Sequence, residues 1–387
     1  MGFRRSAAAA FLLAGLMTVP TAAAAARPQR TELARTIDAR VGEAMRRTGA
    51  RGLAMAVVSQ GRPVLVKSWG ERNAKGEPLR TDTVMYGASI TKAVFAYTVM
   101  QMVDEGKIDL DRPVAALLSR PLPDYGNLDD YGNWGDLAGD PRWKKITPRN
   151  ALTHSTGFAN FSFLEPDGKL KFHFDPGARY AYSGEGIVLL QFAIEQRLGV
   201  KLGAEMQRRV FDRFGMTDTS MAWRPSFRRN LADGWRADGT PGPHDERSVA
   251  RAAGSMDTTI VDLARFAAGF MRGEGISAKA RAEMLRPQLA ITTKSQFPTL
   301  QAELPPERRW PGLAAGLGVV TFRGPQGRGF FKGGHDDQTA NTWVCVERGR
   351  RCVVILSNDV RAEAAFPELV RAALGETGIP WRWEYGG

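Results

Sequence analysis

The stretch "YGASITKAVF", residues 86–95, decides the fold, because it places a serine three positions before a lysine at the head of an apolar run. Positions three apart share one face of a helix, so the side chains of Ser89 and Lys92 are expected to lie together. The run predicts a buried helix from Ser89 to Glu105. Burial would lower the pKa of the lysine until its amine can accept a proton. Two interpretations follow: Ser89 is a nucleophile with Lys92 as its partner, or Ser89 simply caps the helix.

The sequence before this stretch predicts a helix and a hairpin. Residues 32–46 carry apolar side chains four positions apart, as an amphipathic helix does. Residues 52–70, "GLAMAVVSQGRPVLVKSWG", hold two β-rich runs on either side of Gln60-Gly61-Arg62. A short glycine-containing segment between two such runs is typical of a β-hairpin.

The sequence after it changes character twice. Residues 119–148 are dense in Pro, Gly, Asp, Tyr and Trp and predict a long irregular excursion. From residue 316 onward, short β-rich runs return. Helical patterns are expected at 185–198, 201–213, 257–272 and near 361–374.

Strands therefore stand at both ends of the chain, with a mainly helical middle between them. The N-terminal strands need partners, and the C-terminal strands supply them, which predicts an α+β fold. We expect a single module over residues 27–387. Its sheet part would take about 27–88 and 250–387, and an inserted helical part would take about 89–249.

The first residues are typical of a secretory signal peptide. "MGFRR" is basic, "SAAAAFLLAGLMTV" is apolar but short for a bilayer span, and "PTAAAAAR" offers small residues for cleavage. We expect a signal peptide over residues 1–26, cleaved after Ala24, Ala25 or Ala26, and hence a periplasmic or secreted protein. The alternative is an uncleaved anchor. No later segment has about 18 consecutive apolar residues, so no stable membrane insertion of the mature chain is expected.

The basic residues are spread along the chain. The formal net charge is +12, and removal of Arg4 and Arg5 with the signal peptide would leave +10. Because no basic run is interleaved with aromatic residues, we expect no nucleic-acid partner. Since the lysines and arginines are spread out, a solvated surface is the preferred interpretation; the alternative is weak association of the exported basic protein with anionic cell-wall polymer.

The sequence shows no motif that is typical of a metal site or a cofactor-binding site. The four histidines, His154, His173, His244 and His335, show no paired ligand spacing. The two cysteines are too few for a disulfide framework and do not mark a metal site. We therefore expect no metal and no cofactor.

The two cysteines stand in "CVERGRRC", with an apolar run on either side. If Arg348-Gly349 is a two-residue turn, Cys345 directly faces Cys352 on the neighbouring strand. Opposed residues of an antiparallel pair lie within the range that a disulfide accepts. We expect the bond; the alternative is two buried thiols beside a turn that is one residue longer.

Two further stretches accompany the serine–lysine pair. "FDPGARYAYSGEG" carries Tyr182-Ser183-Gly184, and "GFFKGGHDD" carries Lys332-Gly333-Gly334. This order of motifs resembles the penicillin-recognising serine hydrolases, which include class C β-lactamases, D-alanyl-D-alanine carboxypeptidases and related esterases. "DTVMYGASITK", "GKIDLDRPV" and "ITPRNALTHSTGF" extend the resemblance over about residues 35–360. It implies a β-lactamase/transpeptidase-like fold, an antiparallel sheet flanked by helices with an inserted mainly helical subdomain.

The resemblance also implies a role for each matching residue. Ser89 is the nucleophile that accepts the acyl group, and Lys92 and Tyr182 share the work of base and proton relay. Lys332, expected on an edge strand, keeps positive potential beside Tyr182 and the substrate. The main-chain N–H groups of Ser89 and His335 form the oxyanion hole.

Two substrate-binding positions depart from the family pattern. Many family members carry Asn where this chain has Gly184, and Thr or Ser where it has Gly333, next to Gly334. Both changes remove polar contacts to a peptide-like or anionic substrate. They favour a serine hydrolase that acts through an acyl-enzyme on a small-molecule or peptide ester or amide, with esterase-like activity preferred, over a β-lactamase or a D-amino-acid peptidase. The remaining alternative is a member of the fold that binds cell wall or ligand without turnover.

Three other features of the sequence bear on the site. Lys201-Leu202-Gly203 also spells Lys-x-Gly, but it lies between helical segments, so Lys332 is preferred. His154 is interpreted as a structural residue. The excursion at 119–148 is expected either to form one wall of the cleft or to lie away from it.

Overall fold

The computed structural model describes residue 2 and residues 22–386 of the chain. Most of the predicted signal peptide, residues 1 and 3–21, lies outside the described residues, so export stays a prediction. Within the described part of the chain, no helix is both long and apolar enough to cross a membrane.

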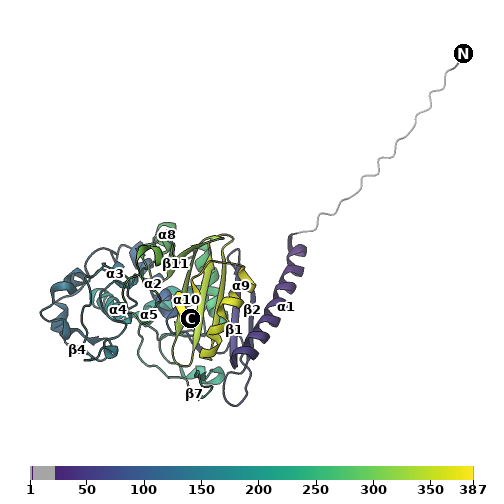
Figure 1. The fold of residues 1–387 in the computed structure, drawn as a ribbon, viewed down its shortest axis with the longest axis horizontal. Coiled ribbons are helices and arrows are strands. Elements are labelled where there is room, and N and C mark those ends of the chain that lie inside the picture. Colours follow the sequence, from purple (N-terminus) through teal and green to yellow (C-terminus); the bar gives the residue numbers. More distant parts are fainter. Residues whose placement is uncertain (1, 3–21, 387) are drawn as a thin grey trace.

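The centre of the protein is an antiparallel sheet of eight strands (Figure 1). From one edge to the other, the order is β2, β1, β14, β13, β12, β11, β10 and β9. Their bounds are β1 Gly52–Ser59, β2 Arg62–Gly70, β9 Leu289–Ala290, β10 Ala314–Ala315, β11 Val320–Gly324, β12 Gly327–His335, β13 Ala340–Val346 and β14 Arg351–Ser357. Because β1 pairs with β14, strands from both ends of the chain share one sheet, which confirms the α+β prediction.

The predicted hairpin is formed by β1 and β2, where Ser59 pairs with Arg62 across a two-residue turn. Both turn residues have positive φ, 53° at Gln60 and 69° at Gly61. A turn of this hand matches the twist of the two strands, and glycine adopts it at no steric cost.

Helices cover both faces of the sheet. One face packs against α1 (Ala22–Thr48), α9 (Phe366–Leu374) and α10 (Trp381–Tyr385), and the other against α2 (Ile90–Asp104) and α7 (Ile260–Arg272). Alternate residues of β1 enter the two cores: Leu53, Met55 and Val57 on the first face, Ala54, Ala56 and Val58 on the second. The helices predicted at 32–46 and 89–105 are therefore confirmed as α1 and α2.

The remaining helices lie mainly beside the sheet, toward the left of Figure 1. They are α3 Pro148–Leu152, α4 Gly184–Leu198, α5 Leu202–Met206, the π-helix η6 Gln207–Phe211, α6 Asp212–Phe214 and α8 Ala278–Leu285. Short 3-10 helices are η1 Val114–Leu117, η2 Leu122–Tyr125, η3 Trp134–Leu137, η4 Pro141–Lys145, η5 Ser162–Leu164, η7 Pro225–Asn230, η8 Pro306–Arg308 and η9 Val360–Ala365. Small strand pairs are β3 Met85–Tyr86 with β8 Asp257–Thr258, β4 Asn127–Leu128 with β5 Gly132–Asn133, and β6 Gly234–Trp235 with β7 Pro241–Gly242.

The predicted edge position of Lys332 is wrong. Its strand β12 lies inside the sheet, between β13 and β11, because the short strands β11, β10 and β9 extend the sheet beyond it. However, β11 pairs with β12 only over Gly327–Phe331, so the segment from Lys332 to His335 has its ladder partner on β13. Among the described residues, no strand pairs with the other side of the segment from Lys332 to His335.

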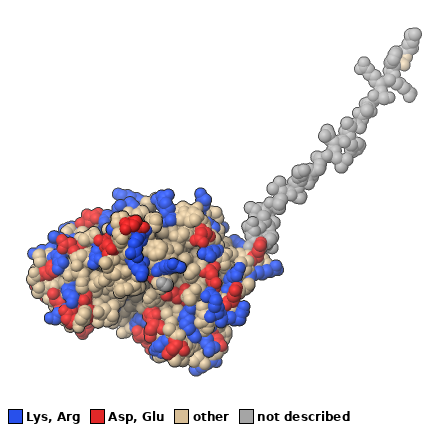
Figure 2. Space-filling view, in the orientation of Figure 1, with Lys and Arg blue, Asp and Glu red and all other residues tan. Residues whose placement is uncertain are grey.

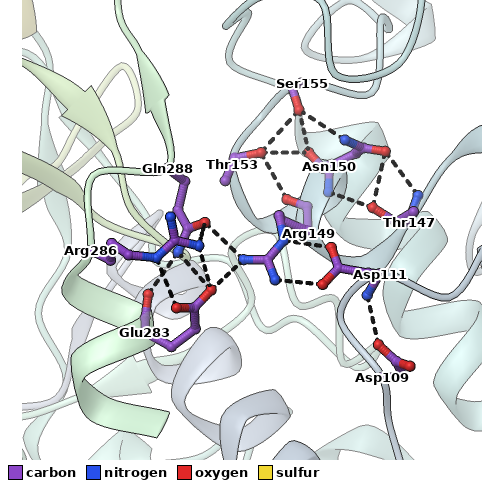
Figure 3. Close-up of polar contacts among 10 residues, drawn as sticks. All are labelled: Asp109, Asp111, Thr147, Arg149, Asn150, Thr153, Ser155, Glu283, Arg286 and Gln288. Carbon is purple, nitrogen blue, oxygen red and sulfur yellow. Dashed lines mark hydrogen bonds and ion pairs between the residues drawn. The ribbon is translucent and has the colours of Figure 1, made fainter. Parts of the chain in front are cut away.

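A polar network fixes α3 against its neighbours (Figure 3). Arg149 makes two hydrogen bonds of 2.7 Å to Asp111 and reaches Glu283 at 2.5 Å and Gln288 at 2.7 Å. The guanidinium thereby joins the turn before residue 114, α3 and the region of α8. This network holds the segment that leads from α3 to His154 beside the site.

The predicted disulfide is present between Cys345 and Cys352. These residues face each other in the β13–β14 register, and both are fully buried. The turn closes as expected, because Arg350 N–H donates to the Glu347 carbonyl at 3.0 Å.

Charged side chains of both signs are scattered over the face shown in Figure 2. Basic and acidic groups lie among larger areas of other residues there. The net positive charge is therefore not gathered into one stripe on this face, and association with cell-wall polymer stays a prediction.

Candidate active site

The side chains of Ser89, Lys92 and Tyr182 meet at the start of α2. Ser89 Oγ lies 2.9 Å from Lys92 Nζ and 2.8 Å from Tyr182 OH. Ser89 occupies the N-cap position of α2, yet within the described chain its hydroxyl makes no capping hydrogen bond. The geometry therefore contradicts the capping interpretation and leaves the hydroxyl free for chemistry.

The backbone before the serine is held in an uncommon conformation. Ala88 has φ of 46°, in the left-handed region that non-glycine residues rarely adopt. The turn is fixed because Gly87 N–H donates to the Met256 carbonyl at 2.8 Å and its own carbonyl accepts from Ile90 at 3.1 Å. Such strain collects at functional sites, and here it presents Ser89 at the mouth of the helix.

Lys92 is suited to accept a proton. It is 1% exposed, and its Nζ also donates to the Ala253 carbonyl at 2.5 Å. Burial, and then the charge of Lys332, hold the pKa of Lys92 well below its ordinary value. A neutral amine at hydrogen-bond distance from Ser89 is a competent general base.

Tyr182 lies between two amines. Lys92 Nζ is 5.0 Å and Lys332 Nζ 5.1 Å from the centre of its ring. Burial raises the pKa of Tyr182, and its hydrogen bond with Ser89 acts in the opposite direction. The phenol therefore stays protonated in the resting site. This suits Tyr182 to relaying a proton and makes it unsuited to taking the first proton from Ser89.

Lys332 is buried on β12 with 4% exposure, and its Nζ donates to the Gly333 carbonyl at 2.6 Å. Burial lowers the pKa of Lys332 to about 8, while the charge of Glu384 raises it. The ammonium form therefore still dominates at neutral pH and places positive potential beside Tyr182.

The main chain of β12 passes directly over the start of α2. A Cβ built on Gly334 would lie 2.8 Å from Ser89 N and 2.9 Å from Ile90 N, so only glycine fits there. His335 follows, and its Nδ1 lies 3.2 Å from Glu363 Oε2. Its side chain thus has a partner on η9, and the oxyanion role of its N–H group remains an expectation.

The space beside Gly184 is filled by an aromatic ring. A Cβ on Gly184 would lie 2.3 Å from Phe161 Cζ, so an asparagine at this position would collide with that ring. Phe161 stacks on Phe163 with ring centres 5.2 Å apart, and Phe163 is 72% exposed. An apolar surface thus takes the place of the asparagine amide that many family members carry at this position.

The space beside Gly333 is filled by a carboxylate. A Cβ on Gly333 would lie 2.1 Å from Glu384 Oε1. Glu384 belongs to the C-terminal helix α10, about 50 positions after the motif. Sequence reasoning missed this residue, because no spacing or motif connects "WRWEYGG" to the Lys-x-Gly segment.

A cleft of about 710 Å³ opens in front of Ser89, and Lys92, Tyr182 and His335 line it with the serine. Its mouth is partly apolar, with Phe161, Phe163 and Phe297 among the lining residues.

The 119–148 excursion contributes Tyr131 and Gly132 to the wall of this cleft. Trp134 and Trp143 instead lie buried in the core. One part of the excursion thus borders the site, and another part supports it from within.

His154 lies behind Tyr182, with ring centres 4.4 Å apart, and Ser183 N–H donates to its Nδ1 at 3.2 Å. Burial and then the neighbouring lysine charges hold the pKa of His154 well below its ordinary value. A neutral, hydrogen-bonded imidazole fits the structural role expected from the sequence. Lys201 is exposed, precedes α5, and is not among the residues that line the cleft.

Two solved structures share this fold. The chain is similar to D-alanine carboxypeptidase AmpC from Burkholderia cenocepacia, with a TM-score of 0.70 and 18% identity over 89% of this chain and 99% of that one. It is also similar to the octameric penicillin-binding protein homologue from Pyrococcus abyssi, with a TM-score of 0.70 and 18% identity over 88% and 77%. At this identity the likeness shows the fold alone.

Curated relatives are similar over part of the chain. Lovastatin esterase from Penicillium rubens is 28% identical over 208 residues, 46% of this chain and 51% of that protein. Monacolin J acid methylbutanoyltransferase from Aspergillus terreus is 30% identical over 204 residues, 42% and 48%. The matches span about half the length of these relatives. A family model described as Beta-lactamase matches residues 37–375.

Proposed function

The chain belongs to the β-lactamase family, and on that premise we propose that it is a serine hydrolase that cleaves esters through an acyl-enzyme on Ser89. The single observation that carries the proposal is the position of Ser89 Oγ, 2.9 Å from Lys92 Nζ and 2.8 Å from Tyr182 OH. A serine hydroxyl becomes a nucleophile only with such a base in reach.

The acylation step follows from this geometry. The neutral amine of Lys92 takes the proton of Ser89 as Oγ bonds to the ester carbonyl carbon, and the charge on the carbonyl oxygen is stabilised by the N–H groups of Ser89 and His335. When the ester C–O bond breaks, Tyr182 passes a proton to the departing alkoxide and regains one from the Lys92 ammonium.

Deacylation reverses the proton path. A water molecule attacks the acyl carbon and gives its proton to the same base. The carbon–oxygen bond to Ser89 then breaks, and Ser89 regains its proton. Water thus supplies the hydroxyl of the acid product, and the site returns to its resting state.

The preference for esters is supported by what surrounds the serine. Phe161 fills the space beside Gly184, and Phe163 and Phe297 extend an apolar mouth. Such a surface binds apolar acyl or alcohol groups and offers no amide contact at position 184. Two partial relatives are named for ester hydrolysis and methylbutanoyl transfer, which agrees with acyl groups of this kind.

A β-lactamase or a D-amino-acid peptidase acting on cell-wall peptides is the competing reading. It draws on the family and on the similarity to a D-alanine carboxypeptidase. A non-catalytic ligand-binding role is disfavoured, because Ser89, Lys92 and Tyr182 are all present and in contact.

A substrate panel tests the proposal. We expect the wild-type protein to hydrolyse p-nitrophenyl butyrate with a higher kcat/KM than nitrocefin or D-alanyl peptides. Ser89→Ala, purified in parallel, should abolish turnover of every substrate. Turnover of nitrocefin or a D-alanyl peptide that exceeds ester turnover tenfold would support the competing reading, and no turnover of any substrate would support the binding role.

We also propose that the protein is exported. The proposal draws on the N-terminal sequence "MGFRRSAAAAFLLAGLMTV" and on the disulfide Cys345–Cys352, which persists in an oxidising compartment. Cell fractionation with N-terminal sequencing of the mature protein tests it. A start near residue 27 is expected, whereas cytoplasmic protein with an intact N-terminus contradicts it.

A further inference from the structure

Helix α10 places the side chain of Glu384 next to β12, the strand that carries Lys332. The helix is anchored because Gln296 N–H donates to the Trp383 carbonyl at 2.7 Å and Trp383 Nε1 donates to Thr293 at 3.2 Å. Glu384, the next residue, is 4% exposed and faces β12. It lies beyond the residues that the family model matches, 37–375.

The carboxylate of Glu384 takes space that a side chain at position 333 would need. A Cβ on Gly333 would lie 2.1 Å from Glu384 Oε1, nearer than non-bonded atoms approach. Glycine at position 333 and glutamate at position 384 are therefore a matched pair. In the motif, Gly333 lacks the hydroxyl that many family members have. In the fold, the same glycine leaves room for the Glu384 carboxylate.

Glu384 and Lys332 share one small buried cavity. Tyr182, His154 and Gly333 line the same space, which has a volume of about 10 Å³. Glu384 Oε2 has no hydrogen-bond partner among the described residues. A buried carboxylate without a full set of partners is costly unless a nearby positive charge offsets it, and Lys332 is such a charge.

We propose that Glu384 is a positioning and specificity-determining residue, which balances the charge of Lys332 and thereby directs the enzyme to uncharged acyl groups over acyl groups that carry a carboxylate. The inference rests on the proposed ester hydrolysis at Ser89. Without Glu384, the Lys332 ammonium would attract an anionic substrate group. With Glu384 behind it, that attraction is cancelled for substrate while the lysine stays in place beside Tyr182.

The titration of the cluster agrees with this geometry. Burial raises the pKa of Glu384, whereas the charges of Lys332 and His335 lower it and that of Glu363 raises it. Burial lowers the pKa of Lys332 to about 8 and Glu384 acts against that fall, so loss of the carboxylate lowers the pKa of Lys332 further. The other titratable groups that face this cluster are Lys92, His154, Tyr180, Tyr182 and Tyr385.

The test compares two esters that differ only in charge, the p-nitrophenyl ester of monomethyl adipate and that of adipic acid. We expect wild-type protein to prefer the methyl ester by about 10-fold in kcat/KM, because the balanced Lys332–Glu384 pair does not offset the cost of removing the substrate carboxylate from water. Glu384→Gln should reduce this preference to about twofold, mainly by lowering KM for the anionic ester. Its alkaline limb of kcat/KM should also move to lower pH, which a merely structural role would not cause.

Two controls separate the outcomes. Glu368→Gln removes a partly exposed carboxylate of the same C-terminal region, one that pairs with Arg47, and should leave the preference unchanged. Ser89→Ala tests the proposed function itself: if it still hydrolyses both esters, the acyl-enzyme is wrong, whatever Glu384 does. A folded Glu384→Gln protein with unchanged preference and unchanged alkaline limb overturns the role of Glu384. If that variant does not fold, the wild-type preference decides, and equal or better turnover of the anionic ester overturns the proposal.

Discussion

Tyr182 OH donates a hydrogen bond of 2.8 Å to Ser89 Oγ, although the two residues stand 93 positions apart in the chain. The contact brings the entrance of α4 against the start of α2 and places the phenol within reach of the nucleophile. Lys92 approaches the same oxygen at 2.9 Å from the next turn of its own helix. The serine therefore has two partners: the Lys92 amine, which can accept a proton, and the Tyr182 phenol, which carries one.

The first prediction is that Lys92 and Tyr182 act as a unit. Lys92→Ala and Tyr182→Phe should each lower the acylation rate by at least about 100-fold, the usual effect of losing general-base help. The double variant should be barely slower than the slower single variant, because each residue depends on the other. Stopped-flow release of p-nitrophenol measures the rates, and losses that multiply would indicate independent roles.

The second prediction concerns pH. Acylation needs Lys92 neutral and Lys332 protonated, so the rate should rise as pH passes the depressed pKa of Lys92 and fall as pH passes about 8, the pKa of Lys332. Arginine stays protonated at every accessible pH, so Lys332→Arg should remove the fall while lowering the maximum. A profile of kcat/KM from pH 5 to 10 measures both limbs. A limb near pH 8 that persists in Lys332→Arg would assign it to another group.

The third prediction concerns the apolar mouth of the cleft. Phe161→Ala should lower kcat/KM for p-nitrophenyl hexanoate by about 10-fold, since burial of a phenyl group against an acyl chain contributes roughly 1.5 kcal/mol. The effect on p-nitrophenyl acetate should be within about twofold. Gly184→Asn should have an effect similar to that of Phe161→Ala. A Cβ at position 184 would lie 2.3 Å from Phe161 Cζ, so the ring would have to move away. Equal losses on both esters would place the acyl chain elsewhere.

The fourth prediction concerns the disulfide. The loop between Cys345 and Cys352 is short, so the bond should contribute only about 2 kcal/mol in the loop-entropy model. Reduction should lower Tm by a few degrees and leave ester hydrolysis intact, since the bond lies away from the cleft residues. Thiol titration of unfolded, unreduced protein should find none; two thiols per chain would refute the bond.

The sequence was most informative where local patterns carry the structure. The helix after Ser89 and the hairpin at Gln60-Gly61 follow from periodicity and turn chemistry, and the facing cysteines follow from strand pairing. The family resemblance supplied the partner Tyr182, which no local spacing connects to the serine.

Features set by distant packing escaped the sequence. The edge position assigned to Lys332 was wrong, because β11 pairs with β12 and the two-residue strands β10 and β9 extend the sheet beyond it. The order of strands in a sheet is set by packing, and no local pattern shows it. Phe161 and Glu384 were missed for a related reason: each fills the space of a missing side chain on a different element. The sequence shows that a side chain is missing at Gly184 and Gly333. Only the fold shows which side chain fills the space.

The most direct test of the central claim is the intact mass of the protein after incubation with an activated phosphonate ester. The account predicts one covalent adduct per chain, on Ser89, with simultaneous loss of ester hydrolysis, and no adduct on Ser89→Ala. A Ser89→Ala protein that still gains the adduct and still hydrolyses esters at the wild-type rate would contradict it.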